Sequence, residues 1–110
     1  MKTLLFIVAL LLTSATASAY DLGYLSSVPA HASRDYEIEL PSGHSFVEVI
    51  GDGGELTCTA HLPQSIDRLQ VGVKVCQFRF NSKTDKTMTL TVANNAGNPV
   101  QLRFVITDNR

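Results

Sequence analysis

The feature that most constrains the fold is an alternation of apolar and polar residues that runs from Asp35 almost to the C-terminus and pauses only at turn residues. Successive side chains of a β-strand point to opposite faces, so a period of two predicts strands with one buried face. Pro, Gly, Asn and Asp clusters separate the runs. The predicted strands span residues 35–40, 44–50, 55–62, 66–73, 74–81, 87–93 and 100–107.

No long window after residue 19 keeps the 3.6-residue apolar period of a helix. Seven to eight short strands with turns between them predict an all-β fold, an antiparallel β-sandwich or jelly roll over residues 35–110. The core side chains are expected to be the apolar set of each strand. These inward sets include Leu56, Cys58, Ala60 and Leu62, then Cys76, Phe78 and Phe80, then Met88, Leu90 and Val92, and finally Val100, Leu102, Phe104 and Ile106.

Residues 1–19 have the composition of a cleaved secretory signal peptide. Lys2 precedes nine apolar residues, Leu4 to Leu12, and small residues follow up to Ala17-Ser18-Ala19, which predicts cleavage before Tyr20. The apolar run is too short to anchor the chain in a membrane, since a spanning helix needs about 20 residues. We therefore expect a secreted or periplasmic protein with no membrane insertion after cleavage.

Cleavage would leave 91 residues with eight basic and ten acidic side chains and no basic cluster, so nucleic acid is not an expected partner. In an oxidising compartment the two cysteines, Cys58 and Cys76, are expected to form a disulfide. The bond would close a loop of about nineteen residues and, in the chain-entropy model, stabilise the fold by about 3 kcal/mol. Both cysteines lie in inward sets, so the bond should tie two strands, or two sheets, together inside the core.

Residues 20–34 follow neither period, and we expect them to form an N-terminal arm before the sandwich. The apolar residues of this arm either cover a sheet edge or contact a partner. They are Tyr20, Leu22, Tyr24 and Leu25.

Four stretches within residues 43–108 carry a resemblance to a known family. They are Gly51-Asp52-Gly53-Gly54-Glu55-Leu56-Thr57-Cys58, Val75-Cys76-Gln77-Phe78-Arg79-Phe80, Leu90-Thr91-Val92-Ala93-Asn94-Asn95-Ala96-Gly97 and Leu102-Arg103-Phe104-Val105-Ile106-Thr107. Together they resemble the bacterial pre-peptidase C-terminal domain family. The resemblance implies a small secreted β-sandwich. Some family members bind calcium, but Thr57 stands where the family usually has a second acid, and a hard cation needs six to eight oxygen ligands. We expect no metal and no cofactor.

The sequence holds no recognisable catalytic arrangement. Ser42-Gly43-His44-Ser45 places serines next to a histidine, but neighbours on a strand point to opposite faces, and no Gly-x-Ser-x-Gly elbow is present. The three histidines, His31, His44 and His61, lack the spacing of metal ligands. We therefore predict a protein that is not an enzyme.

Two regions are candidates for binding. The first is an outward strand face that Thr57, Thr59 and His61 would share with Thr87, Thr89 and Thr91 if their strands lie in one sheet; the alternative is an ordinary solvated sheet face, since threonine favours strands. The second consists of two loops, one at Ser42, Gly43 and His44 and one at Asn94 and Asn95.

Together these features predict a small, non-catalytic, secreted or periplasmic module that recognises a protein through a sheet face or edge. A polysaccharide is a possible but less favoured partner, because the chain has no tryptophan. The alternative function is a secreted inhibitor of a lysozyme or protease, since a disulfide-tied sandwich presents rigid loops at a low ordering cost.

Overall fold

The computed structural model describes residues 4–7 and 18–109, with side chains for residues 26–107. Most of the predicted signal peptide, residues 1–3 and 8–17, lies outside the described residues. The strands are β1 (Leu4–Ile7), β2 (Ser18–Val28), β3 (Ser33–Leu40), β4 (Gly43–Gly51), β5 (Leu56–His61), β6 (Arg68–Val73), β7 (Val75–Ser82), β8 (Lys86–Asn94) and β9 (Val100–Asn109). In the described part of the chain, no helix is long and apolar enough to cross a membrane.

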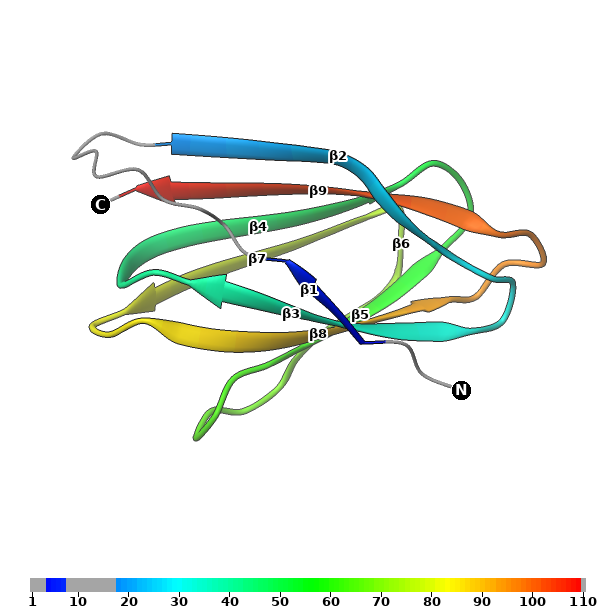
Figure 1. Cartoon of the computed structure of the whole chain (residues 1–110). Helices are drawn as coiled ribbons and strands as arrows, with labels where there is room; N and C mark the ends of the chain where they lie inside the picture. The colour runs from blue at the N-terminus through cyan, green and yellow to red at the C-terminus, as the bar shows by residue number, and fades with distance from the viewer. Residues whose placement is uncertain (1–3, 8–17, 110) are drawn as a thin grey trace.

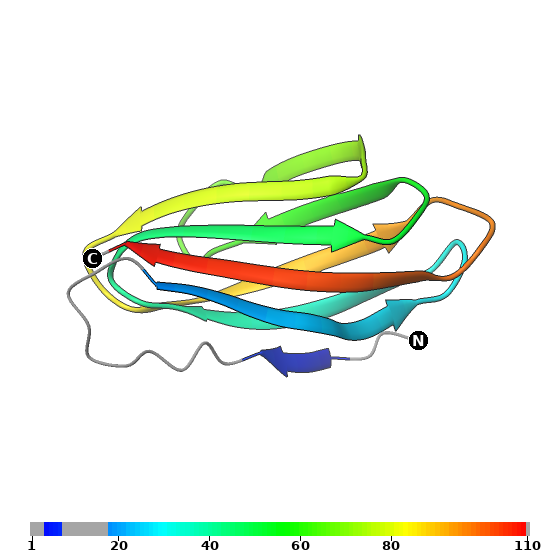
Figure 2. The ribbon, with the colours of Figure 1, turned by 90° about the horizontal axis from the view of Figure 1, so that it is seen from above.

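The strands form two stacked sheets (Figure 1, Figure 2). The five-stranded sheet has the order β1-β3-β8-β5-β6, and the four-stranded sheet has the order β2-β9-β4-β7. Strands β2 to β9 pair antiparallel throughout, whereas β1 pairs in parallel with β3. The predicted all-β sandwich of seven to eight antiparallel strands is confirmed.

The core consists of the side chains that the alternation assigns to the inward faces. Burial follows a period of two on β5, β7 and β8, as the sequence predicts. Phe104 of β9 packs on Tyr36 of β3, with ring centroids 4.9 Å apart across the two sheets. Leu62 alone among the predicted inward residues is only partly buried, because it follows the last residue of β5.

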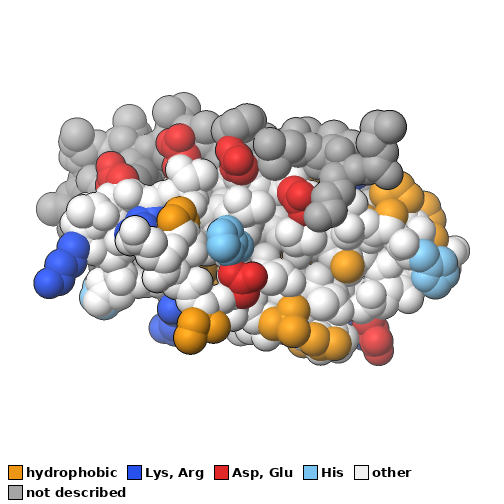
Figure 3. All heavy atoms as spheres, turned by 90° about the horizontal axis from the view of Figure 1, so that it is seen from below, with side chains coloured by type: hydrophobic (Ala, Val, Ile, Leu, Met, Phe, Trp, Pro, Cys, Tyr) orange, Lys and Arg blue, Asp and Glu red, His pale blue; other side chains and the backbone are white. Residues whose placement is uncertain are grey.

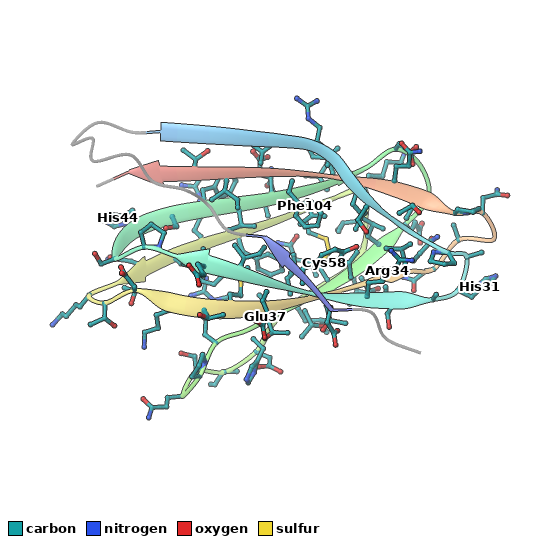
Figure 4. The ribbon with its side chains drawn as sticks, in the orientation of Figure 1. His31, Arg34, Glu37, His44, Cys58 and Phe104 are labelled. Carbon is teal, nitrogen blue, oxygen red and sulfur yellow. A yellow bond between two sulfur atoms is a disulfide. The ribbon has the colours of Figure 1, made fainter. Side chains whose placement is uncertain are left out.

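The disulfide joins Cys58 of β5 to Cys76 of β7 and therefore ties the two sheets together. Both cysteines are fully buried, and the described residues contain no free cysteine. Figure 4 shows Cys58 in the layer between the sheets, next to the yellow sulfur bond. The predicted pairing is confirmed, and the second of the two predicted arrangements, a link between sheets, is the one observed.

The segment 20–34, expected to be an arm, instead contributes to the sandwich. β2 (Ser18–Val28) pairs with β9 and forms an edge of the four-stranded sheet, and β3 begins at Ser33. The register of β2 shifts twice, between Asp21 and Tyr24 and again before Ser26. Each shift interrupts the alternation, which is why period two is not visible in this part of the sequence.

Tyr36 links the two sheets beside this edge. Its phenol donates a hydrogen bond of 2.8 Å to the hydroxyl of Ser26 on β2. Burial raises the pKa of Tyr36 above its ordinary value of 10.0, while the Ser26 hydrogen bond and the charge of Arg34 act in the opposite direction. The folded protein therefore holds the phenolic proton more tightly than the unfolded chain.

This difference predicts a loss of stability at high pH. The contribution of Tyr36 is fully present below the unfolded pKa of about 10, and it is lost as the pH rises through the higher folded pKa. The free energy of unfolding can be measured with urea at about pH 8 and about pH 11 for the wild type and for Tyr36→Phe. Between these two pH values it should decrease more for the wild type than for the variant. Equal decreases would contradict the prediction, because the remaining tyrosines are common to both proteins.

Candidate binding face

The two predicted threonine strands lie side by side in one sheet. β5 pairs with β8, and the register places Thr59 opposite Thr91 and His61 opposite Thr89. Thr57 and Thr87 extend these two columns on the same outward side. We call the face formed by these six residues the threonine face. The condition that the sequence left open, a shared sheet, is therefore met.

A column of acidic residues extends this face on β3. Asp35, Glu37 and Glu39 alternate with the buried Tyr36, Ile38 and Leu40, and they pair with Thr91, Thr89 and Thr87 in register. The Thr91 hydroxyl donates a 2.7 Å hydrogen bond to an Asp35 carboxylate oxygen. We call Asp35, Glu37 and Glu39 the acidic column. This column was not predicted, although its signal, an acidic residue at every second position of a predicted strand, is visible in the sequence.

The opposite margin of the same face is hydrophobic. Leu69 pairs with Thr59 and is 59% exposed, and Val71 is 65% exposed. Ile66, in the connection before β6, is 92% exposed. Figure 3 shows acidic side chains in a row along one margin of this surface and hydrophobic ones along the other. Among the described side chains that β3, β8, β5 and β6 place on this face, none is Lys or Arg; the exposed Arg68 of β6 lies on the other side of the sheet, over Phe80.

The side chains at the rim of the threonine face are held in place. The His61 ring nitrogen Nδ1 lies 2.6 Å from an Asp67 carboxylate oxygen. The Asn95 amide donates a 2.7 Å hydrogen bond to the Thr57 hydroxyl. Ordered side chains lose less conformational entropy when a partner binds.

The two predicted binding loops lie at opposite ends of the sandwich. The β3–β8 register places Ser33 next to Ala93 and Leu40 next to Lys86, so the loop before β4 and the loop after β8 are a whole strand length apart. Figure 4 shows His44 and His31 at these opposite ends. One compact partner site cannot include both loops.

Asn94, predicted to lie in a binding loop, is a structural residue. Its side chain is 1% exposed. The amide donates to the backbone carbonyls of Val28, Pro29 and Asn98 at 3.1, 3.3 and 2.7 Å, and its oxygen accepts from the Ala96 N–H at 2.9 Å. This network fastens the turn after β8 to the end of β2. Asn94 is therefore unavailable to a partner, whereas Asn95 remains exposed.

The other predicted loop borders a cavity of about 400 Å³ on the four-stranded sheet. The Ser42 N–H donates to an Asp85 carboxylate oxygen at 2.8 Å, and His44 is exposed. The Arg79 guanidinium stacks over Phe46, 4.8 Å from the ring centroid. Among the side chains that the structure describes, none hydrogen-bonds to the buried Ser45 hydroxyl. No described side chain completes a nucleophile, base and acid arrangement here.

The described residues also contain no group of three or more His, Cys, Asp or Glu side chains that could hold a metal ion. Asp52, one of the two acids near the glycine-rich turn, accepts the backbone N–H of Gln101 at 2.9 Å. This carboxylate therefore already serves to fasten the turn to β9.

No protein-family model matches the sequence, and no curated protein matches it. Solved structures are similar in fold. The pre-peptidase C-terminal domain of collagenase from Bacillus anthracis is 13% identical, with a TM-score of 0.56 over 98% of this chain and 97% of that chain. PliG from Aeromonas hydrophila, a periplasmic inhibitor of g-type lysozyme, is 9% identical, with a TM-score of 0.54 over 96% of this chain and 97% of that chain.

The chain has the fold of a pre-peptidase C-terminal domain. This confirms the fold that the sequence resemblance implied. At such low identity the likeness concerns the fold alone, and one fold carries many functions. The function must therefore be argued from the side chains that this chain places on the fold.

Proposed function

We propose that the protein is a secreted or periplasmic, non-catalytic module that binds another protein through the threonine face and the acidic column. The observation that carries the proposal is the register of three neighbouring strands, which aligns Asp35 with Thr91 and Thr59, and Glu37 with Thr89 and His61. The result is a polar surface with hydroxyl and carboxylate groups at regular register positions. Its rigid, disulfide-tied support keeps the ordering cost of binding low.

The charge of the surface defines the partner. Glu37 and Glu39 form no ion pair with any residue that the structure describes, so their carboxylates favour a partner of opposite charge. Complementary potentials increase association rates and specificity. The exposed Leu69 and Val71 add apolar area at one margin. Sugar-binding faces usually stack sugars on the rings of Trp, Tyr or Phe, and none of the described outward residues of this sheet is one of these three. A basic protein is therefore favoured over a polysaccharide.

The predicted signal peptide and the confirmed disulfide both support a location outside the cytoplasm. The absence of a catalytic arrangement among the described side chains supports a role in binding. His61 pairs with Asp67, but no described hydroxyl or thiol hydrogen-bonds to the ring.

A second candidate function is inhibition of a lysozyme or protease. Its support is the shared fold with the lysozyme inhibitor PliG from Aeromonas hydrophila. An acidic, rigid face suits an enzyme of positive net charge.

One pair of variants tests the binding face. Thr59→Lys with Thr89→Lys places two positive charges at the centre of the threonine face, and a basic partner should then bind at least about tenfold more weakly. The matched control, Gln101→Lys with Thr107→Lys, adds the same charge to the outward face of β9 and should change the dissociation constant by less than about twofold. The partner is captured from envelope and secreted fractions, and its affinity is measured by calorimetry after purification.

If both variants and the wild type bind the partner with equal affinity, the threonine face is excluded as the binding site. Capture of no protein by the wild type would contradict protein recognition itself. The same proteins, titrated against g-type and other lysozymes and a set of proteases, test the second candidate. Failure to slow any of these enzymes at micromolar concentration would contradict inhibition and leave the binding proposal standing.

A further inference from the structure

One edge of the five-stranded sheet is occupied by a segment that secretion is expected to remove. β1 pairs with β3 over four residues, from Leu4 with Asp35 to Ile7 with Ile38. Figure 2 shows β1 at the outer margin of the sandwich. These residues lie within the predicted signal peptide, residues 1–19. Cleavage before Tyr20 would leave the backbone N–H and C=O groups on this side of β3 without a strand partner.

An unpaired strand edge can accept an extended peptide through backbone hydrogen bonds, while the alternate side chains determine the specificity. The register of β1 defines the apolar positions of such a peptide. Leu5 and Ile7 occupy the register positions of Tyr36 and Ile38, whose side chains face the core. Apolar residues are therefore expected at every second position of the peptide.

The positions between them face the acidic column. Directly opposed charges on neighbouring strands stabilise a sheet when they differ in sign and destabilise it when they are alike. Within the described residues, neither Glu37 nor Glu39 forms an ion pair. Lys or Arg at the intervening peptide positions would supply the missing opposite charge. A second copy of β3 is a poor occupant, because it would bring two acidic columns together.

We propose that the β3 edge, once residues 1–19 are removed, binds an extended segment of a basic protein in which apolar residues alternate with Lys or Arg. The segment adds a strand parallel to β3 at the position that β1 holds. This inference rests on the proposed function and specifies the chemistry of the partner. It also makes partner binding dependent on processing, because β1 blocks the site in the uncleaved chain.

The test uses protein recovered from the secreted or periplasmic fraction, with its N-terminus at Tyr20 verified by mass. The probe is a fluorescent peptide, Lys-Leu-Lys-Ile-Lys-Leu-Lys, titrated by anisotropy. We expect saturable binding that Glu37→Lys with Glu39→Lys weakens at least about tenfold. The full chain 1–110, in which β1 occupies the edge, should also bind at least about tenfold more weakly.

Two further peptides separate strand addition from charge attraction alone. Each carries N-methyl groups on alternate backbone nitrogens, one on the odd and one on the even positions. Only one set of N–H groups faces β3 in a paired strand, so one peptide should lose binding and the other should bind within about twofold of the parent.

Three results would overturn the inference. In the first, the peptide shows no saturable binding to the processed protein; in the second, the two methylated peptides bind it with equal affinity; in the third, the full chain 1–110 binds the parent peptide as tightly as the processed protein does. If the peptide does not bind while capture of a protein still depends on Thr59 and Thr89, the inference about the β3 edge is wrong and the proposed function is retained. If the peptide binds and no protein partner depends on the threonine face, the edge is the site and the face is not.

Discussion

Replacing Cys58 and Cys76 together by alanine is expected to lower the free energy of unfolding by about 3 kcal/mol. The bond links residues 18 positions apart in sequence and joins the two sheets at fully buried positions. Without it the unfolded chain gains conformational entropy, and the folded protein loses a covalent link through its core. For a domain of this size the melting temperature should decrease by roughly 12–24 °C.

Thermal and urea unfolding followed by circular dichroism measure this loss. The wild type treated with a reducing agent serves as the control and should approach the stability of the double variant, which the reducing agent should leave unchanged. A difference below about 1 kcal/mol between wild type and variant would show that the sheets hold together without the bond.

Asn94→Ala is expected to lower the free energy of unfolding by about 3 kcal/mol. The substitution removes all four hydrogen bonds of the side chain and leaves the Val28 and Asn98 carbonyls and the Ala96 N–H without this partner. A buried polar group left unpaired costs about 1–3 kcal/mol, so the loss of several partners exceeds the effect of an ordinary surface change.

The neighbouring Asn95→Ala provides a matched control. Asn95 is exposed and, among the described residues, its side chain makes one hydrogen bond, to Thr57, so its replacement should cost less than about 1 kcal/mol. Urea unfolding of both variants distinguishes the two roles. If both variants lose a similarly small amount of unfolding free energy, the structural role of Asn94 is contradicted, and Asn94 is again a candidate for binding.

These two predictions differ in how much of them the sequence supports. The disulfide follows from two cysteines, a signal peptide and two inward strand positions. The role of Asn94 does not, because an asparagine in a turn-like sequence is equally typical of an exposed loop. Its partners Val28 and Pro29, at the end of β2 and just after it, are 66 and 65 residues away along the chain, so these two hydrogen bonds exist only after β2 and β8 have been brought together.

The candidate site likewise combines features that the sequence predicts with features that only the tertiary structure shows. The outward direction of Thr57, Thr59, His61, Thr87, Thr89 and Thr91 could be predicted from period two. Their assembly into one surface could not, and neither could the addition of the acidic column, since each requires a neighbouring strand and its register. No strand was predicted in residues 20–34 for a related reason: the register shifts of β2 hide its alternation, and its partner β9 lies far away in sequence.

By itself, the sequence determined which side chains face the core, because alternation within a strand is local and burial of apolar area drives it. It also determined the pairing of the only two cysteines. Only the tertiary structure decided which strands are neighbours. The strands predicted from the sequence share the same period of two, so alternation cannot distinguish one neighbour from another. The turn at Gly51–Gly54 illustrates this, because it passes from one sheet to the other, between β4 and β5. Long-range backbone pairing therefore assembled the threonine face, the acidic column and the β3 edge.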